Sequence, residues 1–431
     1  MTTDQTQNSP PPPAPETLRT QHDFLRLWLG QSISTLGSSV SSVALPLVAV
    51  VTLNATAMQV GLLNFAQSLP VLPLSLFIGV LVDRVSRRRL LVLSDIGRGV
   101  VVGLIPLLAL VDALSMEAMY ACVFTLGVLT MVFDVAYMSY LPHLVPGSLL
   151  VTANSRMELT RNVIGLAGKG VAGVAVTVMR IPFVVAADAI SYLCSAVSVA
   201  LIRRPEAPRA PSPKPGPRQI RLEMREGLSA LFANRYLRAQ TVNAAVSNFL
   251  TQIVLTLFVL YATRDLHLSG GWIGVIFGAG SVGGVVGSLL VPRLVDRFGF
   301  GAAFFGFMVA LRAALLCVAF VRGPELFVVA GLTVLWFIAL LGLVGANICF
   351  GTLRQVAVPD TLRGRTNAAL NMLIIGVTPL AALLAGFLGS RIGVHATLLT
   401  ATLLMPVPLI LVAFSPVRRM RDVSEAAPRS S

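Results

Sequence analysis

Charged residues are scarce in this chain of 431 residues. Asp, Glu, Lys and Arg together make up 12% of the sequence, about half of the share that is usual in soluble proteins. Hydrophobic residues make up 55%, so the polar residues are too few to cover the surface of a soluble protein of this length. The composition argues against a soluble multidomain enzyme and predicts an all-α membrane protein that crosses the bilayer many times.

Lysine and cysteine are almost absent. Only Lys169 and Lys214 are lysines, so the net charge of +14 comes almost entirely from Arg. Such a charge would also suit a nucleic-acid-binding protein, but the placement of the Arg residues, given below, argues against that class. The four cysteines lie in apolar runs, at spacings that fit neither a metal site nor a disulfide framework. We therefore expect no metal and read them as small buried hydrophobic residues: Cys122, Cys194, Cys317 and Cys349.

A nucleotide-binding motif is also missing. The phosphate-binding pattern G-x-x-x-x-G-K-[ST] does not occur anywhere in the sequence. We expect neither a cofactor nor an enzymatic activity, and we do not expect ATP-driven work by this chain alone. If the protein moves a substrate across the membrane, an ion gradient is the expected source of energy, most simply a proton gradient.

Apolar runs long enough to cross a bilayer recur along the chain. Each crossing helix needs roughly 20 residues, and twelve runs meet that length. The predicted spans are 24–51, 57–82, 90–111, 116–139, 157–179, 182–202, 239–262, 271–292, 300–321, 326–350, 367–390 and 395–415.

The basic residues predict how these spans are oriented. Alternate loops fall into two sets, one with 19 Lys and Arg residues and the other with four. Loops rich in Lys and Arg stay in the cytoplasm, so the first set is predicted to be cytoplasmic, with both termini on that side of the cell membrane. The positive charge then marks topology, and nucleic acid is not an expected partner. The basic set comprises the loops 83–89, 140–157, 203–238, 292–299 and 351–366.

The longest basic loop divides the chain into two halves. It starts with a Pro-rich stretch, and residues 219–234 then mix Ile, Leu, Met and Phe with charges. Two interpretations stand: an amphipathic helix at the membrane interface, or a solvated linker helix. The predicted organisation is a disordered cytoplasmic tail (1–20, not a signal peptide), a six-helix bundle (21–202), the cytoplasmic linker (203–238), a second six-helix bundle (239–415) and a cytoplasmic tail (416–431).

The two halves repeat each other at a fixed interval along the chain. Six landmarks recur at one constant interval, which we call the repeat interval, and the letters LVDR occur at 81–84 and again at 294–297. Six matches without a gap indicate duplication of a six-helix unit. Because six is even, both copies have the same orientation, which is a parallel repeat with an axis along the membrane normal. The pairs that define the repeat interval are Gly61 and Gly274, Asp83 and Asp296, Arg84 and Arg297, Pro146 and Pro359, Asn154 and Asn367, and Gly173 and Gly386.

Residues 79–91, GVLVDRVSRRRLL, resemble the signature loop between helices 2 and 3 of the major facilitator superfamily, with Ser86 in place of the usual Gly. The segments FDVAYMSYLPHLVP (133–146), DAISYL (188–193) and RQVAVPDTLRGRTNA (354–368) resemble the branch that contains macrolide efflux proteins and the enterobactin exporter. The resemblance implies the major facilitator fold, with two six-helix bundles and a substrate site between them.

The signature loop carries an implied mechanical role. In the superfamily the matching Asp packs near the positive end of a helix in the other half and helps to latch the inner side. The alternative is that these Arg residues only set topology. The residues of this inner-gate motif are Gly79, Asp83, Arg84, Arg87 and Arg88, with a remnant at Asp296 and Arg297 in the second half.

Ionisable residues inside predicted spans are functional candidates, because charge is costly within a membrane. Asp95 and Arg98 are one helical turn apart, so they suit an internal ion pair. Together with three others they suit a network that braces or gates the inner face, with direct proton coupling as the less favoured reading. The full set is Asp95, Arg98, Asp134, Glu158, Arg161, Lys169, Asp188 and Arg312.

Lys169 stands where a glycine-rich motif of superfamily exporters has Pro. Two readings remain open: a residue that faces the cavity and binds an acidic substrate or a carboxylate, or a Lys tolerated by packing. The missing Pro makes the usual kink doubtful, while the glycines permit close helix contact. The glycine face comprises Gly165, Gly168, Gly170 and Gly173.

The roles of Asp188 and Arg312 are also open to two interpretations. Asp188 shares a helix face with Ser191, Ser195 and Ser198. The sixth helix of each half is peripheral in the superfamily, which favours a bracing role over proton carriage. Arg312 has the opposite charge and suits a counter-ion role.

Polar and aromatic residues mark a candidate cavity. The resemblance implies that the first and fourth helices of each half line the pathway, and their mild polarity suits an amphipathic organic substrate. Each residue alone could equally form hydrogen bonds between helices. The candidates are Gln31, Ser34, Ser38, Asn243, Ser247, Thr251, Trp336 and Asn347.

These features predict a monomeric secondary transporter of an amphipathic organic compound, with protons and membrane lipids as its other partners, and the resemblance alone implies that it exports this compound. An importer or a lipid flippase on the same fold is the alternative, and a membrane receptor is less favoured. One departure concerns coupling: residues 116–139 lack the Arg that drug–proton antiporters carry in helix 4.

Overall fold

Polar capping residues set where three of the six helices of the first half begin. The computed structural model describes residues 18, 20–70, 85–203, 217–358 and 362–426. Thr56 and Gln59 form a capping box, and the hydroxyls of Ser86 and Ser115 accept hydrogen bonds from the first turns of their helices. The helices of this half are α1 (His22–Leu47), α2 (Ala57–Ser68), α4 (Arg87–Leu110), α5 (Met116–Leu144), α6 (Gly147–Val178) and α7 (Ile181–Ala200).

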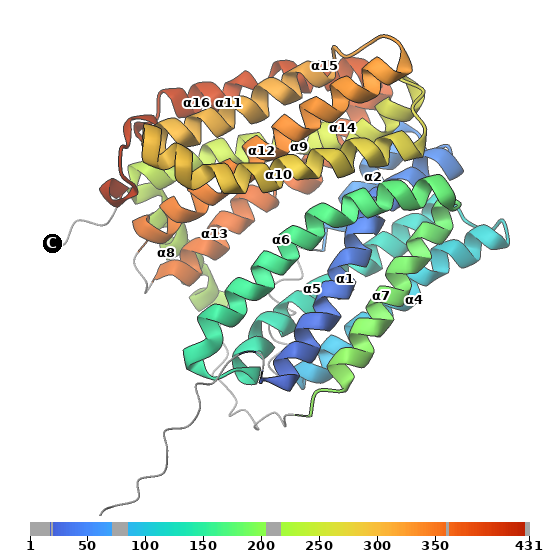
Figure 1. The fold of residues 1–431 in the computed structure, drawn as a ribbon, viewed down its shortest axis with the longest axis horizontal. Helices are drawn as coiled ribbons and strands as arrows, with labels where there is room; N and C mark the ends of the chain where they lie inside the picture. The colour runs from blue at the N-terminus through green and yellow to red at the C-terminus, as the bar shows by residue number, and fades with distance from the viewer. Residues whose placement is uncertain (1–17, 19, 71–84, 204–216, 359–361, 427–431) are drawn as a thin grey trace, which may run out of the picture.

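The second half starts with the linker helix and follows the same order. Asn234 and Ser269 cap two of its long helices. The described part of the chain contains helices and no strand (Figure 1). The helices of this half are α8 (Pro217–Ala233), α9 (Arg235–Arg264), α10 (Gly270–Phe298), α11 (Phe300–Val318), α12 (Glu325–Ala357), α13 (Arg363–Ile375), α14 (Thr378–Arg391), α15 (Val394–Leu403) and α16 (Pro406–Ala413).

Prolines interrupt the last two predicted spans, which are each two helices rather than one. The span predicted at 367–390 breaks between α13 and α14, next to Pro379, and the span predicted at 395–415 breaks at Pro406. Proline lacks an N–H and clashes with the preceding turn, so it starts a new helix more readily than it continues one. By contrast, α6 has no proline after Gly147 and runs unbroken for 32 residues. Whether the missing Pro at Lys169 also removes the usual kink stays a prediction.

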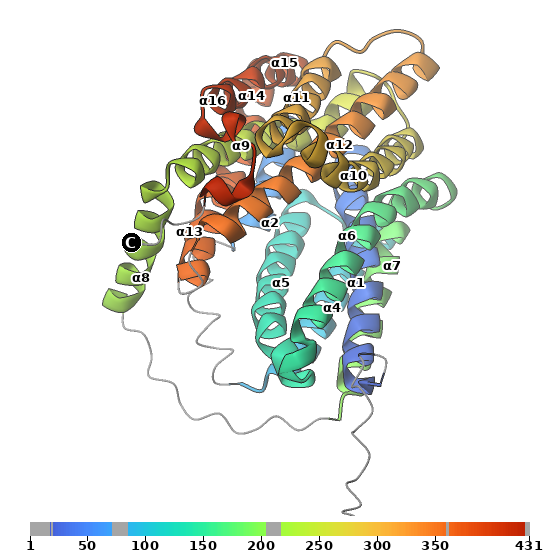
Figure 2. The same cartoon turned by 60° about the vertical axis from the view of Figure 1, so that its left-hand side comes forward.

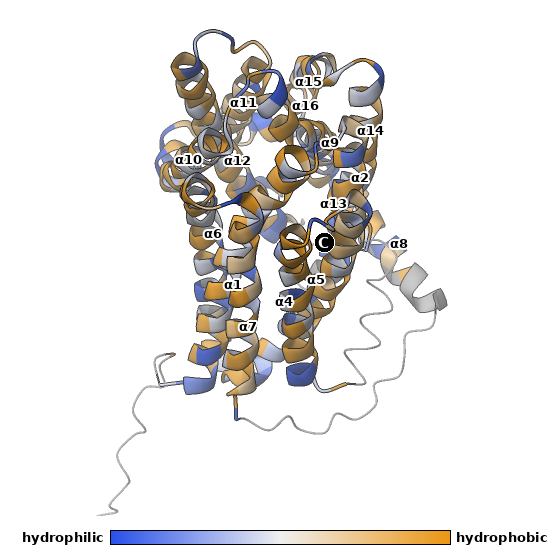
Figure 3. Ribbon diagram, turned by 90° about the vertical axis from the view of Figure 1, so that its right-hand side faces the viewer, coloured by the Kyte–Doolittle hydropathy of each residue, from blue (hydrophilic) through white to orange (hydrophobic). Residues whose placement is uncertain are grey.

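Length and hydropathy identify ten of the described helical segments as able to cross a membrane. The two remaining spans are α2, whose description ends near Ser68, and α6, which carries Arg161 and Lys169. With these two, the order of the helices matches the twelve predicted spans. Hydrophobic residues dominate along the helices, and hydrophilic ones lie mostly at their ends and in the loops (Figure 3).

Two glycine contacts join the halves, and the repeat relates them to each other. Gly173 of α6 meets Gly274 of α10 so closely that a Cβ on either would overlap the partner's backbone. Gly61 of α2 meets Gly386 of α14 in the same way. The repeat interval relates Gly61 to Gly274 and Gly173 to Gly386, so it converts one contact into the other. The contacts therefore show the parallel two-fold relation that the sequence repeat predicts.

The two ends of the bundle differ. We call the end where α1 begins and α7 ends the tail end (Figure 1). The glycine contacts lie toward the opposite end, where α6 and α14 finish and α2 and α10 begin. Toward the tail end the ribbons of the two halves diverge (Figure 2).

Two segments outside the spans pack on the second half. In α8, Leu231 is fully buried, Gly227 lies against the backbone of Arg365 in α13, and Glu226 forms an ion pair with Arg365. Near the C-terminus, the carbonyl of Met420 accepts a hydrogen bond from Gly301 N at 2.8 Å. The linker helix is therefore docked on the protein rather than simply solvated.

Candidate functional site

Helix α4 carries a buried ion pair into the centre of the first half. Arg98 is bonded to Asp95 one turn away, and the two residues are 5% and 0% exposed. The guanidinium lies 4.0 Å from the ring centroid of Phe133 and 4.5 Å from that of Tyr192. The ion pair expected from the spacing is present. Two aromatic faces from α5 and α7 hold its cation in place.

Asp188 of α7 is buried beside this pair but is not part of it. Its carboxyl is 0% exposed, and within the described residues it forms no ion pair. Ser191 Oγ donates a hydrogen bond to its Oδ1 at 3.1 Å, and the hydroxyls of Ser38 and Ser41 of α1 lie beside it. Helix α1 comes this close because Gly37 has no Cβ to collide with Asp188 and Ser191.

Hydroxyl and amide groups connect the three helices around these charges. Gln31 Nε2 donates to Ser195 Oγ at 3.3 Å, and Ser195 lies beside the Asp95 carboxyl. On the other side, Ser38 Oγ donates to the Tyr192 hydroxyl at 2.9 Å. Polar contacts therefore extend from Gln31, through Asp95 and Arg98, toward Asp188.

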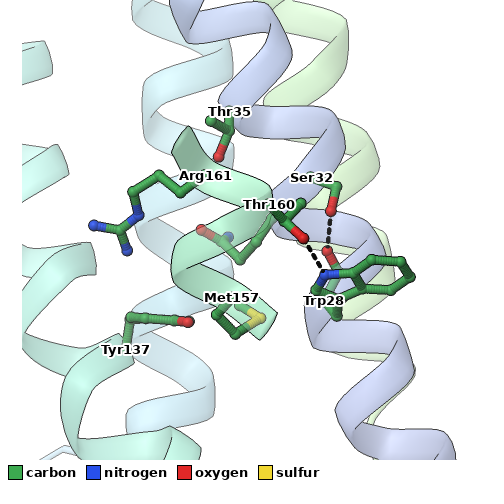
Figure 4. A pocket seen from close by; sticks show the side chains of 8 residues that line it. Trp28, Ser32, Thr35, Tyr137, Met157, Thr160 and Arg161 are labelled. Carbon is green, nitrogen blue, oxygen red and sulfur yellow. Dashed lines mark hydrogen bonds between the residues drawn. The ribbon is translucent and has the colours of Figure 1, made fainter. Parts of the chain in front are cut away.

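A small cavity lies at the Gln31 end of this polar chain (Figure 4). Its volume of about 10 Å³ is room for roughly one water molecule. The Trp28 indole N–H donates to Thr160 Oγ1 at 2.9 Å and closes one side. Arg161 points away from α1, on the side where Tyr137 lies (Figure 4).

The charges predicted on α5 and α6 gather on exposed faces. Asp134, Glu158 and Arg161 all have exposed side chains. Asp134 is within electrostatic range of both Arg161 and the buried Arg98. Four of the five charges expected to form one network are thus linked, Asp95, Arg98, Asp134 and Arg161, while Glu158 lies within electrostatic range of Tyr137. Whether they brace or gate the protein stays a prediction.

Lys169 lies between two contact faces of α6. Gly168 packs against Leu36 and Ser39 of α1, and Gly170 packs against Gly278 of α10. The highly exposed Val178 lies on the opposite side of the helix at 100° per residue, so Lys169 points inward. Lys169 is half-buried, and no hydrogen bond or ion pair involves it in the described structure.

Arg312 is the buried cation of the second half, and it has no acidic partner among the described residues. It is 3% exposed, and its Nη1 lies 3.3 Å from Thr251 Oγ1 and 3.5 Å from Met405 Sδ. The repeat interval relates Thr251 to Ser38 and Met405 to Tyr192, so Arg312 touches the equivalents of residues around Arg98. Met308 and Ala401 stand at the positions equivalent to Asp95 and Asp188. The halves therefore share an architecture, but in the described structure only the first has carboxylates around its buried Arg.

The remaining cavity candidates of the second half are mostly packed in this conformation. Asn243 donates to Gln240 Oε1 at 3.3 Å, and Ser247 Oγ lies 3.5 Å from Asn243 Oδ1. Trp336 is 4% exposed, with its ring centroid 4.3 Å from that of Phe258. In the first half, Ser34 is also buried, whereas Asn347 of α12 is exposed. Their part in a substrate pathway stays a prediction.

Comparison with known proteins decides the family. The family model described as Major Facilitator Superfamily matches residues 27–378. This chain belongs to the Major Facilitator Superfamily. Multidrug efflux pump Tap of Mycolicibacterium fortuitum is 27% identical over 401 residues, which are 90% of this chain and 94% of the pump. Macrolide efflux protein A of Streptococcus pyogenes is 23% identical over 412 residues, which are 92% of this chain and 97% of that protein.

Solved structures of transporters share the fold. A bacterial homologue of the human lysosomal transporter Spinster, inward-facing and unoccupied, aligns with a TM-score of 0.70 at 13% identity and covers 96% of this chain and 100% of its own. A bacterial homologue of the iron transporter ferroportin, inward-facing, also gives 0.70 at 17% identity, with 93% and 100% covered. At these identities the likeness shows the fold alone.

The superfamily signature loop is described only in part. Gly79, Asp83 and Arg84 lie outside the described residues, so the latch stays a prediction. Arg88 donates to the carbonyls of Val199 and Ala200, and so binds the negative end of α7. The remaining motif residues lie at the tail end. Arg87 and His143 both line a hollow of about 400 Å³. Asp296 and Arg297 are exposed near the end of α10.

Four residues around the buried charges were not predicted: Gly37, Ser41, Phe133 and Tyr192. Each acts across a helix interface, which the spacing within one helix does not reveal. The run of small residues at 37–42, GSSVSS, was an available signal that α1 packs closely against a neighbour.

Proposed function

We propose that this chain is a secondary active transporter that exports an amphipathic organic compound across the cell membrane, driven by a proton gradient. The observation that carries the proposal is the pair of glycine contacts between the halves. Because the repeat relates them and both lie toward one end, the halves can rock about them. Such rocking exposes a site between the halves to each side in turn.

The orientation follows from the distribution of basic residues. The tail end carries the loops rich in Arg, so we assign it to the cytoplasm, with both termini. The conformation described above is then closed to the outside. A transporter in this state is ready to accept a compound from the cytoplasm.

The direction of transport and the class of substrate are supported by the relatives. Tap is named as a multidrug efflux pump and the streptococcal relative as a macrolide efflux protein, and both align along most of their length. The inward-pointing ammonium of Lys169 lacks an acidic partner in the described structure. We therefore expect compounds with an anionic or strongly electronegative group to be among the substrates.

Expression in a drug-sensitive bacterial host tests this proposal. We expect higher tolerance to a macrolide and lower accumulation of ethidium, both abolished by a protonophore. Vector alone is one control, and the other is Gly306→Ala, because a Cβ there meets no atom within 4 Å. Faster energised uptake of the same compounds would instead identify an importer.

A further inference from the structure

The buried charges of the first half do not balance. Arg98 is within electrostatic range of three carboxyl groups, on Asp95, Asp134 and Asp188. A second guanidinium, Arg161, acts on the exposed Asp134. The exposed Glu158, which acts on Tyr137 as Arg161 does, adds a fourth carboxylate. Two cations therefore serve four carboxylates, and the one that is fully buried without an ion pair in the described structure is Asp188.

Arg98 is held away from a direct bond with Asp188. Its guanidinium is bonded to Asp95 and stacked between Phe133 and Tyr192. The other groups that surround Asp188 are hydroxyls, from Ser38 and Ser41 of α1 and from Ser191 of its own helix. A buried carboxylate with only hydroxyls around it is costly unless a positive charge accompanies it.

Two unsatisfied atoms show where such a charge would bind. Asp188 Oδ2 and Ser41 Oγ are both buried, and neither has a hydrogen-bond partner in the described structure. Ser41 lies beside the Asp188 carboxyl. A proton on Oδ2 would donate to Ser41 Oγ and satisfy both atoms at once.

We propose that Asp188 binds the coupling cation, a proton held between its Oδ2 and the Ser41 hydroxyl. This inference rests on the ion-driven transport proposed above. The proton is taken up from water and returned to water, and the step forms and breaks only the O–H bond on Oδ2 and its hydrogen bond to Ser41.

The second half of the chain indicates that the carboxyl of Asp188 serves a function and is not needed for packing. At the repeat interval, Ala401 is the equivalent of Asp188 and Val254 is the equivalent of Ser41, and both of these are buried. The same two positions of this helix contact are thus filled by apolar side chains in the second half. Asp188 and Ser41 are therefore not demanded by the architecture, which accommodates apolar residues at both places.

The position of Asp188 also connects the proposed cation site to the contact between the two halves. On one side of α1, Ser38 and Ser41 face Asp188 of α7; on the other, Ser39 packs against Gly168 of α6. Helix α6 carries the contact between Gly173 and Gly274. A change of charge at Asp188 alters how α1 packs on α7, and α1 transmits it to the contact between the halves.

Infrared spectroscopy of the purified full chain in lipid tests the proposal without a substrate. We expect a pH-dependent band of a protonated carboxyl that is absent in Asp188→Asn and present in Glu117→Gln, a control at an exposed carboxyl. Ser41→Ala should keep the band but shift it, because the hydrogen bond is lost. A band that is unchanged in both Asp188→Asn and Ser41→Ala overturns the proposal.

Sodium gives the second arm of the experiment. If the wild type shows no protonated band but a sodium-dependent change in a carboxylate band that Asp188→Asn removes, the cation at this site is sodium, and the assignment to a proton is overturned. If neither cation produces a change that depends on Asp188, the site is wrong. Export of ethidium by the wild type is measured separately, so failure of transport and failure of the cation site are distinguished.

Discussion

Gly37 is the residue on which the contact between α1 and α7 depends. A Cβ at this position would overlap the side chains of Asp188 and Ser191. Overpacking of this kind costs about 1–3 kcal/mol. We therefore expect Gly37→Ala to lower the temperature at which the detergent-solubilised protein unfolds, measured by size-exclusion chromatography after heating. Gly103→Ala is the matched control, because its Cβ would meet Ala189 at an ordinary 3.6 Å; equal losses in both variants would contradict the prediction.

Substitution of the single residue Lys169 tests the proposed class of substrate. If its ammonium meets an anionic group of the substrate, Lys169→Met should reduce efflux of anionic dyes about tenfold, equivalent to about 1.4 kcal/mol of binding. Efflux of neutral dyes should change little. Initial rates of dye efflux from energised cells, over a range of pH, provide the measurement. An unchanged rate and pH profile for anionic dyes would exclude a substrate role for Lys169.

How far single residues could be predicted depends on whether their partners lie in the same helix. The pair Asp95 and Arg98 follows from a spacing of three residues and is found. Tyr192 comes next to Arg98 only because α4 packs on α7, and no pattern within either helix specifies that contact. The isolation of Asp188 from a cation is likewise a property of three helices together.

Among the elements, α8 is the one whose placement the sequence left open. Its mixture of apolar and charged residues predicts an amphipathic helix but not the surface that receives it. The structure places Gly227 against the backbone of α13, while Leu222 and Phe232 remain 50% and 42% exposed. One face of α8 therefore binds the protein, and the exposed apolar side chains are free to reach the membrane interface.

Close packing at Gly227 gives a prediction for this element. Gly227→Leu should displace α8 from α13, because there is no room for a side chain beside the Arg365 carbonyl. We expect faster hydrogen exchange in α8, measured by mass spectrometry. Ser229→Leu, at an exposed position of the same helix, should leave the exchange unchanged. Breaking the exposed ion pair by Glu226→Gln should change it little, since such pairs contribute about 0–1 kcal/mol.

Breaks in the transmembrane helices could be predicted only in part. Pro379 and Pro406 stand at the points where two predicted spans divide. The same residue type lies inside α4 at Pro106 and inside α10 at Pro292, and both helices continue through it. Proline alone therefore does not determine where a helix of this protein breaks.

For the whole molecule, the sequence repeat relates the contacts between the two halves as well as the matching residues that define it. Gly61, Gly173, Gly274 and Gly386 were recognised as two pairs of equivalent positions. The structure shows that each contacts a member of the other pair. A two-fold axis explains this, because a contact between the halves on one side must be matched on the other. The sequence could not predict the contacts themselves, since equivalence says nothing about proximity.

The symmetric contacts predict how the conformational equilibrium is controlled. Leucine at Gly173 or at Gly61 cannot be accommodated while the facing backbones touch, so each substitution should separate the halves at the end opposite the tails. Because the contacts lie on either side of the axis, Gly173→Leu and Gly61→Leu together should shift the equilibrium further than either alone. Distances between spin labels placed on α5 and α12 at the tail end, measured by pulsed electron paramagnetic resonance, should shorten as that end closes. Gly306→Leu, at an exposed position where a Cβ meets no atom within 4 Å, should leave the distances unchanged. If both glycine variants also retain the wild-type distances, the two contacts do not control alternation between the two ends.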